Sequence, residues 1–560
     1  MSTPGDTAAT FCATLVDEWL SLGITQAVIA PGSRSTPLAV QLAARKEFAV
    51  HLFHDERSAS FAALGIGEAT GIPAILLCTS GTAATHFHAA VVEAHQANVP
   101  LIVCTGDRPP ELRDVGAAQT IDQTNLFGSA VRWFHDPGVP SDDASHTWRS
   151  LAARTVSLSC GERPGPVHLN LPFREPLLGT ASPLPDGRHN GWSTVVAAHS
   201  VSAELVASFA ADISGKRGIF IAGRGATSSV LELAQHMGWP VFADPRSGLR
   251  VCEPNVVVAF DPILRNSGFA DSHVPDVVVR VGDPPASKVT AQWVSRHGIP
   301  VVQVQSTSMV TDPDHSTQRT YIAPIDELMT AVKANVSASA SNWAAQWNAA
   351  ETVAQNAISQ WTQKEWSEPS IARTVTDSLA AGSHFVVSSS MPIRDVEWFG
   401  TVTPHVTVHS NRGTNGIDGV TSTAVGVALA TQRPVTVLIG DVACLHDSNG
   451  LWGLAQRNVT MKIVVTNNDG GAIFSFLPQA TQVDEATFEL LYGTPHGASF
   501  EHLAATHGIR YEKATHPESL LAALHSDGTC LIEVPLVRSV NVGQHDALNA
   551  AVVAAVSTVE

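Results

Sequence analysis

Oxygen-bearing side chains follow two neighbouring β-branched runs in the last third of the chain. The run PVTVLIGD ends on Asp441, and KIVVTNNDGG carries Asn467 and Asn468 at its end, with Gly470 two residues after Asn468. The 27 positions from Asp441 to Asn468 leave room for one crossover helix between adjacent parallel strands. A carboxylate, an amide oxygen and a glycine carbonyl are hard ligands suited to Mg²⁺, and the flanking glycines let backbone N–H groups approach a phosphate.

Each half of this pattern also has an ordinary structural explanation. Asn-Asp-Gly-Gly is a common turn, and an Asp directly after a strand is a common helix cap. Either half alone favours that explanation. The two halves together, at the spacing of a β-α-β unit, favour a metal and phosphate site.

A second charged stretch, HDERSAS at 54–60, follows the apolar run at 49–53 and contains Asp55, Glu56 and Arg57. Acids at the start of a helix complement its dipole, so a solvated helix start is one explanation. The other explanation is that one of the carboxylates is held inside the protein for a chemical purpose. The stretch by itself leaves both open.

The elements around these residues indicate an α/β fold with three doubly wound parallel-sheet domains. Short β-branched runs alternate with alanine-rich helical stretches, and ligands of such sheets bind beyond the carboxyl ends of the strands. We expect domains at 1–180, 192–336 and 345–560, joined by the stretches GTASPLPDGRHNG at 179–191 and SASASN at 337–342. The expected strands are 27–30, 49–53, 74–78, 101–105, 166–173, 218–222, 277–283, 301–304, 384–388, 434–439, 461–466 and 529–534, and the expected helices include 325–335 and one from about 543.

Composition excludes several classes of protein. A formal charge of −18 opposes binding to the phosphate backbone of nucleic acid. The seven cysteines are scattered without the close pairs of a zinc or redox motif, which favours free thiols in a reducing cytoplasm. Neither a basic leader nor a long apolar stretch is present, so we expect a soluble cytoplasmic protein without membrane insertion. Local cations must hold any acidic ligand against the negative background.

The G-D and N-N motifs, one β-α-β unit apart in the last of three α/β blocks, resemble those of thiamine-diphosphate-dependent enzymes. The resemblance implies that the N-terminal domain binds the aminopyrimidine of the cofactor and the C-terminal domain binds its diphosphate through Mg²⁺, with Mn²⁺ as a possible substitute. It implies that Glu56 hydrogen-bonds the pyrimidine and so promotes removal of the thiazolium proton. The implied metal ligands are Asp441, Asn468 and the carbonyl of Gly470, and the further implied cofactor-binding residues are Gly471, Ile417, Ile473 and Phe474.

Seven segments resemble one branch of that family in order and spacing. They are APGSRSTPL, DERSA, TGDRPPELRDVGAAQTIDQ, SSSMPIRD, SNRGTNGIDG, GDVACLHD and NNDGGAIFSFLP. The branch consists of transferases of menaquinone biosynthesis that decarboxylate 2-oxoglutarate and add the resulting succinyl-semialdehyde carbanion to isochorismate. Val442 stands where many thiamine enzymes have Gly, and the branch shares that departure.

Both substrates of that branch are dicarboxylates, which arginine binds in planar bidentate pairs. A surface salt bridge is the ordinary explanation of any single arginine, but four lie in the matching loops. The implied substrate-binding residues are Ser33, Arg34, Arg108, Gln119, Lys288, Ser390, Arg394 and Arg412. In the family one pocket is built from two subunits, so the resemblance implies an obligate homodimer, with a homotetramer common.

Two alternatives stay open on the sequence. Another thiamine-diphosphate-dependent 2-oxoacid decarboxylase or carboligase would share every cofactor residue. A nucleotide-binding or regulatory α/β protein would use GIGEATG at 65–71 or IAGRGA at 221–226. The first of these has the wrong spacing of its last glycine and lies in a helical pattern, and the second lacks the full dinucleotide motif.

Overall fold

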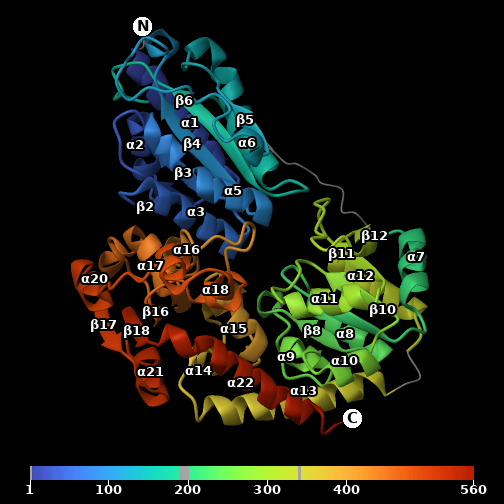
Figure 1. Ribbon diagram of the computed structural model, residues 1–560. Helices are drawn as coiled ribbons and strands as arrows, with labels where there is room; N and C mark the ends of the chain where they lie inside the picture. The colour runs from blue at the N-terminus through green and yellow to red at the C-terminus, as the bar shows by residue number, and fades with distance from the viewer. Residues whose placement is uncertain (1–2, 188–200, 339–341, 560) are drawn as a thin grey trace. The chain divides into compact units, whose positions relative to one another are not determined.

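The computed structural model describes residues 3–187, 201–338 and 342–559. It contains three six-stranded sheets whose strand pairs are parallel (Figure 1). The predicted fold class is therefore confirmed. Residues 188–191 of the first expected linker and 339–341 of the second lie outside the described residues.

The first sheet has the strand order β2-β1-β3-β4-β6-β5. Helices α1 (Pro4–Ser21), α2 (Thr36–Ala44) and α6 (Trp148–Ser159) share one apolar core with it. Helices α3 (Glu56–Thr70) and α5 (His88–Ala97) contact each other and also the sheet. The strands are β1 (Gln26–Ile29), β2 (Ala49–Leu52), β3 (Ile75–Cys78), β4 (Leu101–Asp107), β5 (Trp133–His135) and β6 (Pro166–Pro172).

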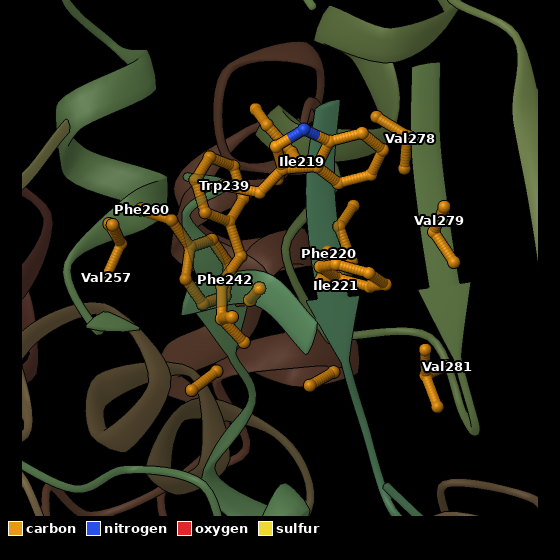
Figure 2. Close-up of a cluster of buried hydrophobic side chains, with 14 of the residues drawn as sticks. Ile219, Phe220, Ile221, Trp239, Phe242, Val257, Phe260, Val278, Val279 and Val281 are labelled. Atoms are coloured by element: carbon orange, nitrogen blue, oxygen red, sulfur yellow. The ribbon is translucent and has the colours of Figure 1, made fainter. Parts of the chain in front are cut away.

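The second sheet has the order β12-β11-β10-β7-β8-β9 and a core rich in aromatic rings (Figure 2). Phe242 stacks on Phe260 with centroids 5.3 Å apart, and Phe220 contacts Trp239 at 5.2 Å. The strands are β7 (Gly218–Ala222), β8 (Val241–Ala243), β9 (Val256–Val257), β10 (Val277–Val281), β11 (Val301–Gln305) and β12 (Thr317–Ile322). The helices include α7 (Ala203–Ile213), α8 (Ser228–Met237), α9 (Phe260–Leu264), α10 (Ser267–Ser272), α11 (Lys288–Arg296), α12 (Ile325–Val332) and α13 (Trp343–Thr362).

The third sheet has the order β14-β13-β15-β16-β18-β17. Gly440 at the end of β15 pairs with Thr466 near the end of β16, so the residues that follow these strands emerge at the same edge. The strands are β13 (His384–Val387), β14 (Thr407–His409), β15 (Val435–Gly440), β16 (Met461–Asn467), β17 (Arg510–Lys513) and β18 (Cys530–Pro535). The helices along this stretch of the chain include α14 (Glu368–Ser378), α15 (Met391–Phe399), α16 (Val420–Thr431), α17 (Asp441–His446), α20 (Phe500–Thr506), α21 (Pro517–Leu524) and α22 (Arg538–Val556).

Every expected strand is present, but the sequence analysis missed β5, β8, β9, β12, β14 and β17. These strands lie at the sheet edges or next to them, and several are short or polar, so they lack the continuous apolar run of a central strand. Helix α22 begins at Arg538, before the expected start near 543. Among the described residues, no helix has both the length and the apolar character that crossing a membrane requires.

The chain forms two compact units. The first consists of the described residues within 1–196, 411–433 and 443–460, and the second of those within 197–410, 434–442 and 461–560. Helix α16 therefore belongs to the first unit, where it packs against α3. The division into domains at 1–180, 192–336 and 345–560 stays a prediction.

Candidate functional site

The carboxylate of Asp441 lies at the end of β15 and is only 2 % exposed. Its Oδ2 accepts the backbone N–H groups of Asn468 and Gly470, both at 3.0 Å, and its Oδ1 accepts the N–H of Val442 at 2.7 Å. Burial raises the pKa of Asp441, and the N–H groups of Gly470 and Val442 oppose that rise. The structure therefore brings together Asp441, Asn468 and Gly470, as the strand spacing predicts.

Asn468 presents an unsatisfied oxygen at the same strand end. Its Nδ2 donates to Oε1 of Glu368 at 2.8 Å, while Oδ1 is buried without a hydrogen-bond partner among the described residues. Burial raises the pKa of Glu368 to about 7, and the nearby carboxylate of Asp395 adds to the rise. An orphaned amide oxygen beside a buried carboxylate fits the donor set of a divalent cation such as Mg²⁺.

The backbone at Gly470 and Gly471 approaches its neighbours too closely for any other residue type. Gly470 has φ +139°, and a Cβ built there would lie 1.9 Å from the carbonyl oxygen of Gly493. A Cβ at Gly471 would lie 2.2 Å from the carbonyl oxygen of Tyr492. The Gly470 carbonyl, the expected metal ligand, also accepts the N–H of Ala472 at 3.1 Å. These contacts explain why glycine occupies both positions.

Ile473 and Phe474 follow these glycines and are both half-buried. The ring of Phe474 contacts that of Tyr492, with centroids 5.4 Å apart. Both residues lie in the short helix Ala472–Phe476, directly beyond the Asp441 cluster in the chain. Their predicted contact with the cofactor stays a prediction.

His496 is a neighbour of this cluster that the sequence analysis missed. Its Nδ1 accepts the backbone N–H of Ala498 at 2.9 Å, which leaves the ring proton on Nε2. That Nε2 lies 3.4 Å from Oδ2 of Asp441. The residue gave no sequence signal because it lies in the irregular stretch YGTPHGAS, 28 positions beyond Asn468.

Two predicted substrate residues, Ser390 and Arg394, lie at the start of α15, which follows β13 in the chain. Ser390 caps α15 with φ +77° and ψ −134°, a conformation that is costly for a residue with a Cβ. Arg394, one turn later, donates from Nη1 to the carbonyl oxygen of Ser390 at 2.6 Å. Burial lowers the pKa of Arg394, and the carboxylates of Glu397 and Asp395 oppose that fall. Backbone strain of this kind concentrates at functional sites.

Lys288 is exposed at the first turn of α11. The loop before it is tied to α15, because the N–H of Ala286 donates to Oε2 of Glu397 at 2.7 Å. Glu397 is fully buried, and Arg250 donates to its carbonyl oxygen at 2.8 Å. The structure thus connects the Lys288 loop to the helix that carries Arg394.

In the first unit, Glu56 is the first residue of α3 and is half-buried. Asp55 is the N-cap: its carboxylate accepts the N–H of Ser58 at 2.9 Å and also a hydrogen bond from Asn449 at 2.7 Å. Arg57 donates to the carbonyl oxygen of His446 at 2.6 Å. Asp55 and Arg57 therefore have structural partners, which leaves Glu56 as the candidate for chemistry.

The surroundings of Glu56 include the end of β3. Burial raises the pKa of the Cys78 thiol, and the nearby carboxylate of Glu56 adds to the rise. Glu56 therefore lies close to the carboxyl end of a central strand, where ligands of parallel sheets bind.

Arg34 is buried at 3 % exposure behind the exposed Ser33. Its guanidinium donates to the carbonyl oxygen of Phe173 at 2.9 Å and to Glu175 at 3.0 Å. Burial lowers the pKa of Arg34, and the positive charge of Arg108 lowers it further, so the two arginines are neighbours. An anion placed between them would relieve that repulsion.

Arg108 and Gln119 both form hydrogen bonds in the loops that follow β3 and β4. Arg108 donates to the carbonyl oxygen of Ala118 at 3.1 Å. Gln119 has φ +55°, and its side chain donates to the carbonyl oxygen of Ser80 at 3.2 Å. The loop after β4 is thus held against the loop after β3.

The segment 411–419 carries Arg412 and Ile417, which are both half-buried. A buried carboxylate on α5, that of Glu93, holds this segment. It accepts the N–H of Gly413 at 2.6 Å, the N–H of Thr414 at 2.7 Å and the hydroxyl of Thr414 at 2.6 Å. Glu93 is a positioning residue that the sequence analysis missed, because a glutamate in the middle of an alanine-rich helix gives no signal of a partner 320 positions away.

Comparison with known proteins gives consistent matches along the chain. Residues 10–126 match the family described as "Thiamine pyrophosphate enzyme, N-terminal TPP binding domain", residues 190–386 match "Middle domain of thiamine pyrophosphate", and residues 399–534 match the corresponding C-terminal TPP binding domain. The 2-succinyl-5-enolpyruvyl-6-hydroxy-3-cyclohexene-1-carboxylate synthase of Thermobifida fusca is 41 % identical over 97 % of this chain and 98 % of its own. The synthase of the same name from Chloroflexus aurantiacus is 39 % identical, covering 93 % and 92 %.

A solved structure also shares the fold. Benzoylformate decarboxylase from Polynucleobacter necessarius superimposes with a TM-score of 0.73 at 16 % identity, covering 94 % of this chain and 98 % of its own. At that identity the likeness supports the three-sheet α/β fold alone.

Proposed function

Because this chain belongs to the 2-succinyl-5-enolpyruvyl-6-hydroxy-3-cyclohexene-1-carboxylate synthases, a family of thiamine pyrophosphate enzymes, we propose that it decarboxylates 2-oxoglutarate and joins the remaining four-carbon unit to isochorismate. The enzyme is then a transferase of menaquinone biosynthesis, and it releases one CO₂ for each adduct. The observation that carries the proposal is the cluster at the ends of β15 and β16, where buried Asp441 lies beside the orphaned oxygen of Asn468.

Asp441, Asn468 and the carbonyl of Gly470 would hold Mg²⁺, or Mn²⁺ in its place, and the metal ion would in turn bind the cofactor's diphosphate. Thiamine diphosphate, when bound, supplies the carbanion chemistry of decarboxylation and carbon–carbon bond formation. The protein then needs few acids and bases of its own, and its contribution is placement and charge.

Glu56 serves as the acid–base group toward the cofactor's pyrimidine. Its position at the start of α3, near the end of β3, leaves its carboxylate available while Asp55 and Arg57 are engaged in structural contacts. Ile417, Gly471, Ile473 and Phe474 contact the cofactor. The Glu56→Gln variant should retain cofactor binding but lose most activity, measured by calorimetric titration and by turnover. A fully active variant would remove Glu56 from the mechanism.

Positive side chains bind the carboxylates of both substrates. The positive charge of Arg108 lowers the pKa of Arg34, and an anion bound by both arginines would offset that repulsion. Arg394 is held by the strained Ser390 backbone, and Arg412 is held by the segment that Glu93 fixes. Ser33, Gln119, Ser390 and Lys288 supply further polar contacts.

An assay of the purified protein with thiamine diphosphate, Mg²⁺, 2-oxoglutarate and isochorismate tests the proposal. We expect the adduct and CO₂ in equal amounts. Decarboxylation of 2-oxoglutarate without adduct would instead indicate another 2-oxoacid decarboxylase or carboligase of the same family.

The proposal includes assembly and location. The enzyme is a homodimer that builds each active site from two subunits, with a homotetramer as the larger form. Sedimentation of the purified protein measures the oligomeric state. It acts in the cytoplasm, where its free cysteines stay reduced.

A further inference from the structure

The side-chain amide of Asn468 has two chemically different ends, and one contact decides which way they point. Nδ2 donates to Oε1 of Glu368 at 2.8 Å, and Oδ1 has no hydrogen-bond partner among the described residues. In its ionised form the carboxylate of Glu368 can only accept, so it selects the NH₂ end of the amide and repels the oxygen end. The oxygen is therefore turned away from Glu368 and kept available as a ligand.

Glu368 is itself held in place by the start of α14. It is the first residue of that helix, where a negative charge is favoured by the helix dipole, and Ser367 caps the helix by accepting the N–H of Ser370. The side chain is 4 % exposed. Its position on a capped and buried helix end leaves the carboxylate little freedom to move.

The charges that surround Glu368 do not make its carboxylate a clear source of folding stability. No Lys, Arg or His side chain among the described residues forms an ion pair with its carboxylate; the nearby carboxylate of Asp395 repels it, and the nearby His545 offsets part of that repulsion. Asp395 instead pairs with His545 at 2.7 Å. Burying a carboxylate without an ion-pair partner costs free energy, so stability alone does not account for Glu368 at this position.

We propose that Glu368 is a positioning residue for the divalent-metal site: its carboxylate holds the amide of Asn468 in the single orientation that presents Oδ1 as a metal ligand. This rests on the proposed function, which makes Asn468 a ligand. Outer groups that orient metal ligands typically contribute 10- to 100-fold in metal affinity.

The test uses Glu368→Gln, which keeps the size of the side chain but carries both a donor and an acceptor, and so permits either orientation of Asn468. Mn²⁺ binding to the full-length protein with thiamine diphosphate is followed by the electron paramagnetic resonance signal of free Mn²⁺. We expect the dissociation constant to rise by about 10- to 100-fold, with the melting temperature of the metal-free protein close to that of wild type. A Glu368→Gln protein that loses its fold would indicate a structural role and overturn the inference.

Two further variants separate orientation from general effects of removing a buried charge. Glu351→Gln is the matched control, because Glu351 is also buried and accepts a backbone N–H, from Ala259 at 2.9 Å. It should bind Mn²⁺ as wild type does. Asn468→Ala removes the ligand, and Glu368→Gln should add no further loss in that background, because Glu368 acts only through Asn468.

The outcomes distinguish this inference from the proposed function. A wild-type protein that binds no Mn²⁺ with thiamine diphosphate would refute the proposed cofactor site itself. A wild-type protein that binds, together with a Glu368→Gln variant of unchanged affinity, would refute the positioning role alone. An equal loss from Glu368→Gln with and without Asn468 would also refute it.

Discussion

Glu93→Ala removes the carboxylate that holds the segment 411–419. Glu93 is 3 % exposed and accepts two backbone N–H groups and one hydroxyl, from Gly413 and Thr414. A hydrogen bond to a charged group contributes about 1.5–3 kcal/mol, so the two backbone bonds alone contribute at least about 3 kcal/mol to the closed segment. Since 1.36 kcal/mol corresponds to a factor of ten in an equilibrium constant, the equilibrium constant for opening of this segment should rise roughly 150-fold.

Hydrogen–deuterium exchange read by mass spectrometry measures this directly. The amides of peptides covering 411–419 should exchange roughly 100-fold faster in Glu93→Ala than in wild type. Thiamine diphosphate should bind more weakly, because Ile417 lies on the same segment. The exchange rate of these peptides in Glu93→Gln should lie between the rates in wild type and in Glu93→Ala. The glutamine keeps one acceptor oxygen but turns an NH₂ group toward a backbone donor.

Glu47→Ala is the control, because Glu47 is exposed and its pair with Arg45 at 3.3 Å is a surface ion pair of small value. Its exchange profile should match wild type. If the peptides covering 411–419 exchanged as slowly in Glu93→Ala as in wild type, the three hydrogen bonds would not be what holds the segment. That result would refute the prediction.

Two further predictions concern stability. His168 is fully buried, and burial lowers its pKa from 6.5 to about 3, so its contribution to stability is complete above pH 6.5 and is lost as pH falls toward about 3. At pH 5.5 the loss should be about 1.4 kcal/mol, and His168→Gln should show a smaller fall in melting temperature between pH 7.5 and 5.5; an identical fall would exclude His168 as the cause. A Cβ at Gly65 would lie 2.1 Å from the carbonyl oxygen of Thr423, so Gly65→Ala should force α3 and α16 apart at a cost of about 1–3 kcal/mol. Gly543→Ala, in open space on α22, should not lower the melting temperature, and equal effects of the two changes would contradict the packing argument.

The adjacency of Asp441 and Asn468 was predictable because it depends on strong signals. The runs before them are buried central strands, and parallel pairing of consecutive runs brings their carboxyl ends to one edge. The GIGEATG stretch was interpreted correctly as packing, since Gly65 lies within α3 at its contact with Thr423. Edge strands such as β12 and β17 were not predictable, because TQRTYI and RYEK carry too few apolar residues to indicate burial.

The residues that support the site were less predictable than the residues proposed to form it. Glu368 follows a serine cap and reads as an ordinary acidic residue in a first turn. Glu93 acts on a segment far away in sequence, and no local pattern marks such a contact. Arg34 illustrates the same limit: the sequence indicates an anion site, but the contacts of its guanidinium with Phe173 and Glu175 depend on tertiary structure.

The return of residues 411–433 to the first compact unit has a consequence for synthesis of the chain. Helix α3 is complete at Thr70, but α16, which covers it, ends only at Thr431. At about 5–20 residues per second, the ribosome needs roughly 20–70 s to make the intervening stretch of about 360 residues. From the end of β6 at Pro172 onward, the nascent chain contains every strand of the first sheet, but helix α3 still lacks its packing partner. The N-terminal portion therefore reaches its final packing only late in translation, and the surface of α3 around Phe61 and Gly65, which packs against Gly419 and Thr423, stays uncovered until then.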